Sequence, residues 1–169
     1  MGVWMEGSFL RMKVYSGSRT YELLRNGAKY VTICIPSKVE LFVDALLEKH
    51  RLTVKRFEEH WFALEDCEAI VATIVERIEQ DQDSLSVYLI PTKIEVLQAL
   101  PKPFRRFDYA ILEMLVILSK AMHGKLSMPE NEVETILRYL TFVIRRTAKD
   151  PRLMKLLEEL SHAVRNLVS

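Results

Sequence analysis

The sequence predicts an α+β fold in which a β-rich half precedes a helical half. In the first hundred residues, apolar side chains alternate with polar ones or form short β-branched runs bounded by turn residues. After residue 100, apolar residues recur every three or four positions, which is the period of amphipathic helices. We therefore expect two domains, residues 1–100 and residues 101–169, with the proline pair Pro101 and Pro103 at the boundary.

The first predicted elements are a β-hairpin and a short helix. Residues 2–5 and 9–15 have the pattern of two strands, and the second strand alternates apolar and polar side chains, as expected when one face is buried. Gly17 interrupts this strand, because glycine readily adopts backbone angles that end one. Ser18 then stands at the N-cap position of a helix that extends to about Asn26.

The next segment predicts one strand, one helix and an irregular connection. Residues 29–35 form a β-branched run that ends at Pro36, and Ser37 is placed to open an amphipathic helix. Residues 51–65 are polar and mixed, and we interpret them as an irregular connection.

A second hairpin completes the β-rich half. Residues 67–79 and 84–90 predict two antiparallel strands joined by the turn at residues 81–83. Residues 94–100 remain open between strand and helix, because a short apolar run does not distinguish the two.

Three helices are predicted in the second half. Residues 107–122 are apolar on nearly every side, which indicates the central and most buried helix. The next helix is expected to use Ser127 as its cap and to carry Pro129 in its first turn. The last helix is expected to open at Pro151.

Composition argues against several classes of function. The chain has 24 basic and 23 acidic residues, so it lacks the basic excess of a nucleic-acid-binding protein. Cys34 and Cys67 lie in apolar runs, where reduced, buried thiols are expected, and the four histidines lack metal-ligand spacing. The longest apolar run is too short to span a bilayer and the first ten residues do not resemble a signal peptide, so we predict a cytoplasmic protein.

The turn of residues 16–22 is the segment with the clearest chemical character. Gly17 allows close approach to the backbone, while Ser18, Arg19 and Thr20 place hydroxyls and a guanidinium beside the first amides of a helix. These groups are the donors that a phosphate monoester requires. The same residues also describe an ordinary helix cap with its arginine in solvent, so both interpretations remain open at this point.

Longer motifs resemble one known family. The sequence is similar to an uncharacterised, largely archaeal family of FMN-binding split-barrel proteins, which are related to flavin reductases and have a helical C-terminal part. The resemblance extends along nearly the whole chain, including the runs Leu10–Glu22 and Val143–Thr147, and is most specific in the turn Gly17–Glu22 and the step Pro103–Arg106. It implies a split β-barrel followed by three helices, an FMN cofactor, and a homodimer with the flavin near the subunit interface.

The resemblance also implies which residues hold the cofactor. Ser18, Arg19 and Thr20 would bind the flavin phosphate, and Gly17 would let the phosphate approach the backbone. The isoalloxazine ring would lie along residues from two strands, namely Lys13, Val14, Tyr15, Ile33 and Cys34. The resemblance identifies neither a catalytic residue nor a metal ligand.

Two departures from the family pattern leave two functions open. Family members have a strand before the position of Met1, so we expect a barrel that lacks its first strand. They also have asparagines near the positions of Leu23 and Cys34. The chain is then either an FMN-dependent oxidoreductase of the flavin reductase type, whose electron donor the sequence does not identify, or a non-catalytic dimeric scaffold that has lost the cofactor.

Overall fold

The computed structural model describes residues 2–98, 105–148 and 150–168. These residues form two compact units, and each is described here by itself. One unit, the β unit, takes residues 1–37 and 53–100, and the other, the helical unit, takes residues 38–52 and 101–169. A single boundary near residue 100 does not separate the units, because residues 38–52 group with the helices. The proline pair Pro101 and Pro103 lies outside the described residues.

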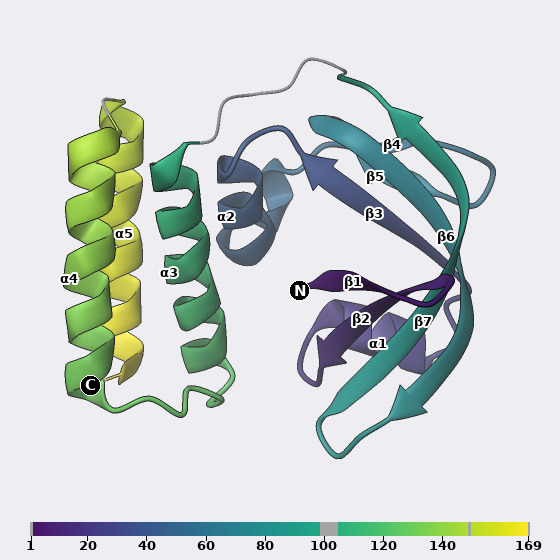
Figure 1. Ribbon diagram of the computed structural model, residues 1–169, viewed down its shortest axis with the longest axis horizontal. Coiled ribbons are helices and arrows are strands. Elements are labelled where there is room, and N and C mark those ends of the chain that lie inside the picture. Colours follow the sequence, from purple (N-terminus) through teal and green to yellow (C-terminus); the bar gives the residue numbers. More distant parts are fainter. Residues whose placement is uncertain (1, 99–104, 149, 169) are drawn as a thin grey trace. The chain divides into compact units, whose positions relative to one another are not determined.

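The β unit is built on a five-stranded antiparallel sheet with strand order β1-β2-β7-β6-β3 (Figure 1). A hairpin of two short strands, β4 and β5, forms a second sheet, and the helix α1 follows β2. Within the described residues β1 and β3 are the two edges, so the sheet is not closed into a barrel. The elements are β1 (Val3–Glu6), β2 (Phe9–Tyr15), α1 (Arg19–Arg25), β3 (Tyr30–Pro36), β4 (Val54–Arg56), β5 (Phe62–Leu64), β6 (Cys67–Gln80) and β7 (Ser84–Val96).

Both predicted hairpins are present, and the second is longer than expected. β7 continues to Val96, so the described part of the ambiguous segment 94–100 begins as a strand. The prediction of an irregular connection over residues 51–65 is wrong, because β4 pairs with β5 there. Each of these strands has three residues and all of β4 is exposed, so neither shows the alternation that marks a longer strand.

The core of the β unit lies on one side of β2 and includes α1. Met12 and Val14 are each 2% exposed and pack against Tyr21 and Leu24 of α1. Ile33 of the distant strand β3 packs against the same cluster. The sheet therefore curves around α1.

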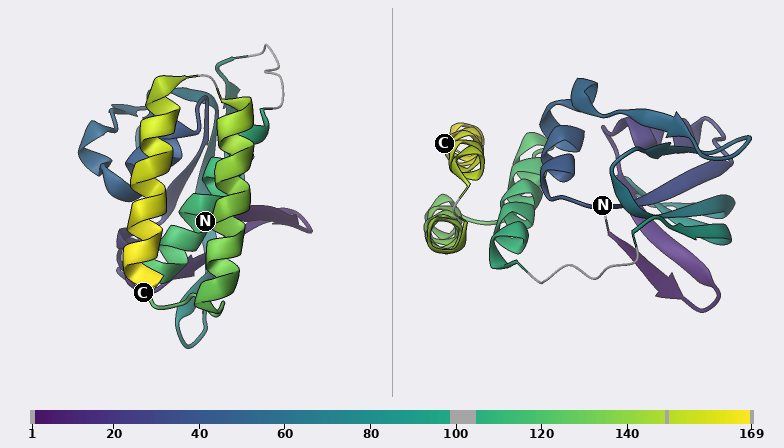
Figure 2. Two further views of the ribbon diagram at one scale, coloured as in Figure 1. Left: turned by 90° about the vertical axis from the view of Figure 1, so that its left-hand side faces the viewer. Right: turned by 90° about the horizontal axis from the view of Figure 1, so that it is seen from above.

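The described residues of the helical unit form four α-helices and one short 3-10 turn. Its helix α3 packs against each of the other three, which confirms that the predicted central helix lies at the centre of this unit (Figures 1 and 2). Its core includes Ile111 and Met114, both fully buried. The elements are α2 (Glu40–Leu47), the 3-10 turn (Lys49–Arg51), α3 (Arg106–Met122), α4 (Glu130–Thr147) and α5 (Pro151–Val168).

Two predicted helix caps are wrong. The amide of Ser37 donates to the carbonyl of Asp66 at 3.1 Å, so its backbone still belongs to the strand pairing and α2 begins only at Glu40. The N-cap residue of α4 is Pro129, with φ −60°, and no side chain caps this helix. Ser127 lies two residues too early, because the helix begins directly after the proline.

Candidate functional site

The candidate site is the strand–turn–helix segment that leads from β2 into α1. Gly17 has φ 85°, a conformation that favours glycine, and it turns the chain sharply after Tyr15. The Ser18 hydroxyl donates to the Tyr15 carbonyl at 3.0 Å and accepts from the Tyr21 amide at 3.1 Å. The predicted N-cap is therefore confirmed, and such a cap contributes about 1 kcal/mol to stability.

Several donors of this turn have no partner in the described part of the chain. The Ser18 hydroxyl proton is already committed to Tyr15, and the Glu22 amide donates to the Ser18 carbonyl at 3.3 Å. Among the described residues the side chains of Arg19, which is exposed, and Thr20, which is half-buried, form no hydrogen bond or ion pair. A guanidinium, a hydroxyl and the first two helix amides are thus available to one anion.

The charges around the turn are mixed. The Ser16 amide donates to the Asp83 carbonyl at 2.9 Å, which brings the turn beside the acidic loop between β6 and β7. Lys13 offsets part of this charge: its Nζ lies 3.8 Å from an Asp81 carboxylate oxygen and 5.6 Å from the centre of the Tyr15 ring. Exposed ion pairs of this kind contribute less than about 1 kcal/mol, so Lys13 can reorient toward another anion.

The structure separates the predicted ring-contacting residues into two groups. Lys13 and Tyr15 point to the outer face of β2, and Tyr15 is half exposed. Val14 is 2% exposed and Ile33 packs against the same core cluster, because alternate residues of a strand face opposite sides. The side chains of Val14 and Ile33 therefore support the sheet from inside, whereas Lys13 and Tyr15 lie next to the turn.

Cys34 lies apart from the turn, in a cluster under the β4–β5 hairpin. Its Sγ accepts from the Leu64 amide at 3.5 Å. It packs beside Cys67, which is 7% exposed. Both thiols are reduced in the structure, as the sequence predicts.

This environment makes Cys67 a poor nucleophile. Burial, together with the neighbouring Cys34 thiol, raises the pKa of Cys67 to about 12. A raised pKa keeps the thiol protonated, so at pH 9 roughly a thousandth of it is ionised in the folded protein. We expect iodoacetamide at pH 9 to alkylate Cys67 slowly in the native protein and rapidly in urea, as followed by mass spectrometry of its peptide. Equal rates in the two conditions would contradict the buried environment.

A cluster of arginine and aromatic side chains on the outer sheet face was not anticipated from the sequence. Tyr88 is 4% exposed, and the guanidinium carbons of Arg11 and Arg77 lie 5.2 and 3.8 Å from its ring centre. Arg11 also binds Glu6 at 2.7 Å, which lowers the pKa of the Glu6 carboxyl. Arg11 pairs with Tyr88 across β2 and β7, so only the strand register brings these groups together. Arg77 in turn lies 3.5 Å from a Glu79 carboxylate oxygen, so both arginines of this cluster are paired with carboxylates; the cluster lies two residues from Lys13 along the same face of β2.

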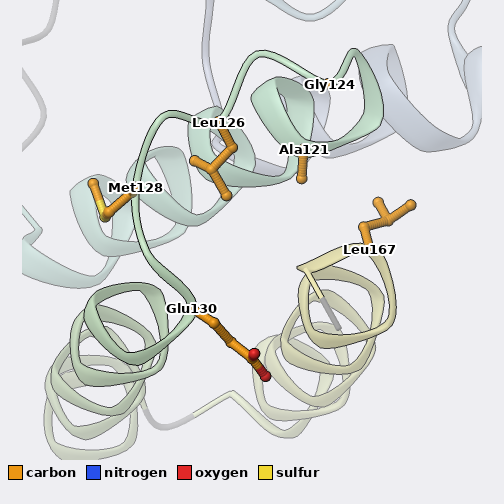
Figure 3. Close-up of a pocket in the computed structure, with 6 residues that line it drawn as sticks. All are labelled: Ala121, Gly124, Leu126, Met128, Glu130 and Leu167. Carbon is orange, nitrogen blue, oxygen red and sulfur yellow. The ribbon is translucent and has the colours of Figure 1, made fainter.

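The helical unit contains a small pocket, and none of the predicted site residues lines it. Its volume is about 220 Å³, and Figure 3 shows the aliphatic side chains and the Glu130 carboxylate that surround it. The lining residues are Ala121, Gly124, Leu126, Met128, Glu130 and Leu167. Among the described residues there is neither a cluster suited to a metal ion nor a helix long and apolar enough to cross a membrane.

Comparisons with known proteins agree with this architecture. A family model described as "Protein of unknown function (DUF447) N-terminal domain" matches residues 1–98. The fold is similar to the crystal structure of an FMN-bound protein of the same family from Methanosarcina mazei, with TM-score 0.73 and 21% identity over 96% of this chain and 85% of that one. It is also similar to the flavin reductase HpaC complexed with NADP+, with TM-score 0.51 and 11% identity over 60% and 69% of the two chains. No curated protein matches the sequence.

Proposed function

The chain belongs to the DUF447 family, and from this premise we propose that its β unit binds flavin mononucleotide, with the phosphate at the turn of residues 17–20. The observation that carries the proposal is the set of unpartnered donors in this turn, described above. The likeness of fold to an FMN-bound protein supports it, since that likeness extends over nearly the whole chain. The same proposal includes the predicted split-barrel fold, to which the open five-stranded sheet of the β unit would correspond.

Each residue of the turn has a separate role in this proposal. Arg19 donates two parallel charge-assisted hydrogen bonds to the phosphate, and Thr20 donates a third from its hydroxyl. Gly17 permits the close approach of the phosphate, because it has no side chain at the bend. Ser18 acts through the backbone: its hydroxyl holds the turn in the shape that exposes the other donors.

The residues that would hold the isoalloxazine ring lie on the outer face of β2. Tyr15 offers an exposed aromatic ring for stacking, and Lys13 places a positive charge beside it. Val14 and Ile33 act indirectly, by packing beneath the sheet. When bound, the flavin supplies hydride or single-electron transfer, and the protein contributes binding, orientation and electrostatics. We further propose a flavin reductase-like oxidoreductase that functions as a homodimer.

A second candidate is a dimeric scaffold of the same fold that does not retain the cofactor. The acidic loop at Asp81 and Asp83 favours it, because two carboxylates beside the turn repel a phosphate dianion. The first measurable difference between the two candidates is the uptake of FMN.

Titration of the purified full chain with FMN tests the proposal. We expect quenching of flavin fluorescence that saturates at micromolar FMN, with weaker binding of riboflavin, because riboflavin lacks the phosphate. The loaded protein is then expected to oxidise NADH or NADPH faster than the same concentration of free FMN. No uptake at micromolar FMN would contradict cofactor binding and favour the scaffold, whereas uptake without faster oxidation would contradict only the reductase activity.

A further inference from the structure

Helix α4 exposes a row of side chains opposite to its buried face. Tyr139 and Phe142 are 60% and 57% exposed, although both are large aromatic residues. They belong to a row with the spacing 3-4-3-4, which places all its members on one side of a helix. We call this row the α4 seam; its residues are Glu132, Thr135, Tyr139, Phe142 and Arg146, all of them exposed.

The two ends of the α4 seam carry opposite charges. The first turn of α4 contains the exposed residues Glu130 and Glu132, and its last turn contains the exposed residues Arg145 and Arg146. Within the described residues neither Glu132 nor Arg146 takes part in an ion pair, and the Arg146 guanidinium lies 5.9 Å from the centre of the Phe142 ring. The seam is therefore acidic at one end, aromatic in the middle and basic at the other end.

The neighbouring helix α5 does not carry such a row. Its outward positions are polar, and among its described side chains Leu167, at the C-terminal end, is the only large hydrophobic one that is exposed. Exposed aromatic and arginine side chains grouped on one face are typical of the energetic centre of a protein interface. The row on α4 therefore has the composition of an interface.

We propose that the α4 seam binds the α4 seam of a second copy of this chain in antiparallel orientation. A two-fold axis between Tyr139 and Phe142 places Tyr139 against the partner's Phe142, and the symmetry repeats this contact. Antiparallel pairing also brings Glu132 within about one helical turn of the partner's Arg146, again twice. The sequence of charges along the seam thus complements itself only in the antiparallel direction, in which the helix dipoles also oppose each other.

This inference deepens the homodimer of the proposed function by assigning it a contact surface, and it does not depend on flavin binding, because the seam belongs to the helical unit alone. A contact made by five side chains of one helix belongs to the small class of interfaces, so we expect association in the micromolar range. Each single charge substitution changes two equivalent ion pairs. We therefore expect Glu132→Arg or Arg146→Glu to weaken association about tenfold, and Glu132→Arg with Arg146→Glu together to restore it.

Analytical ultracentrifugation of the full chain over a range of concentrations tests the seam. Tyr139→Ser is expected to weaken association at least as much as a charge reversal, while Lys155→Glu, a charge reversal on the exposed side of α5, leaves it unchanged. Every substituted side chain is exposed, so we expect each variant to keep its helices. Circular dichroism of each variant checks this expectation.

Three outcomes overturn the proposal. The first is a self-association constant that Tyr139→Ser and both single reversals leave unchanged. The second is a double reversal that associates as weakly as the single ones, because the antiparallel alignment is then wrong. The third is a wild-type chain that stays monomeric at the highest concentration measured.

Discussion

Replacing Arg19 with alanine is expected to weaken FMN binding about ten- to a hundredfold. A hydrogen bond to a charged group contributes about 1.5–3 kcal/mol, and each 1.4 kcal/mol corresponds to about a factor of ten in the dissociation constant. The affinity for riboflavin is expected to stay nearly the same, because Arg19 contacts only the phosphate in the proposed site. Fluorescence titration of both flavins measures the two effects side by side.

Arg25 provides a matched control for this experiment. It is an exposed arginine at the last turn of the same helix, so Arg25→Ala removes the same charge from the opposite end of α1. We expect Arg25→Ala to leave FMN affinity within about twofold of the wild type, since Arg25 lies about 9 Å along the helix from Arg19 and exposed charges are largely screened beyond about 8–10 Å at physiological salt. Equal losses in the two variants would indicate a general effect of charge and would contradict a phosphate site at the turn.

The ratio of the affinities for FMN and riboflavin shows which part of the flavin Arg19 contacts. If Arg19→Ala weakened riboflavin as strongly as FMN, then Arg19 would contact the ring or support the fold. The exposed position of its side chain argues against a role in stability, and thermal unfolding of the variant without flavin checks this directly.

The sequence predicts the candidate turn well because its signals are local. The alternation in β2 locates the strand, and Gly17 and Ser18 carry the bend and the cap within two residues of each other. Such signals depend only on neighbouring residues, so no knowledge of the tertiary structure is needed to recognise them.

The pairing of distant strands accounts for what the sequence does not predict. The alternation of apolar and polar residues shows that the side chains of Val14 and Tyr15 face opposite sides of β2. It does not show that Ile33 of β3 packs against the same core cluster as Val14. It likewise gives no sign that Cys34 lies beside Cys67 under the β4–β5 hairpin. Both facts depend on the register between β3 and β6 and on the curvature of the sheet, which arise from contacts far apart in the chain.

Helix α3 illustrates the same limit within a single element. Its sequence is apolar on nearly every side, which predicts burial all round, yet Tyr109 and Val116 are about half exposed while Ile111 is fully buried. Hydrophobicity alone cannot separate these positions, because the side that faces α4 and α5 is fixed by the packing of the whole unit.

Replacing Ile111 with alanine is therefore expected to lower the free energy of unfolding by about 2–5 kcal/mol, since the cavity left in a close-packed core adds to the lost transfer free energy. Val116→Ala, on the same helix, is expected to change it by less than about 1 kcal/mol, because a half-exposed valine leaves no enclosed cavity. Urea unfolding followed by the circular dichroism of the helices measures both values. Similar losses in the two variants would mean that Val116 is covered in solution, whereas two small losses would mean that the core around Ile111 is not closely packed.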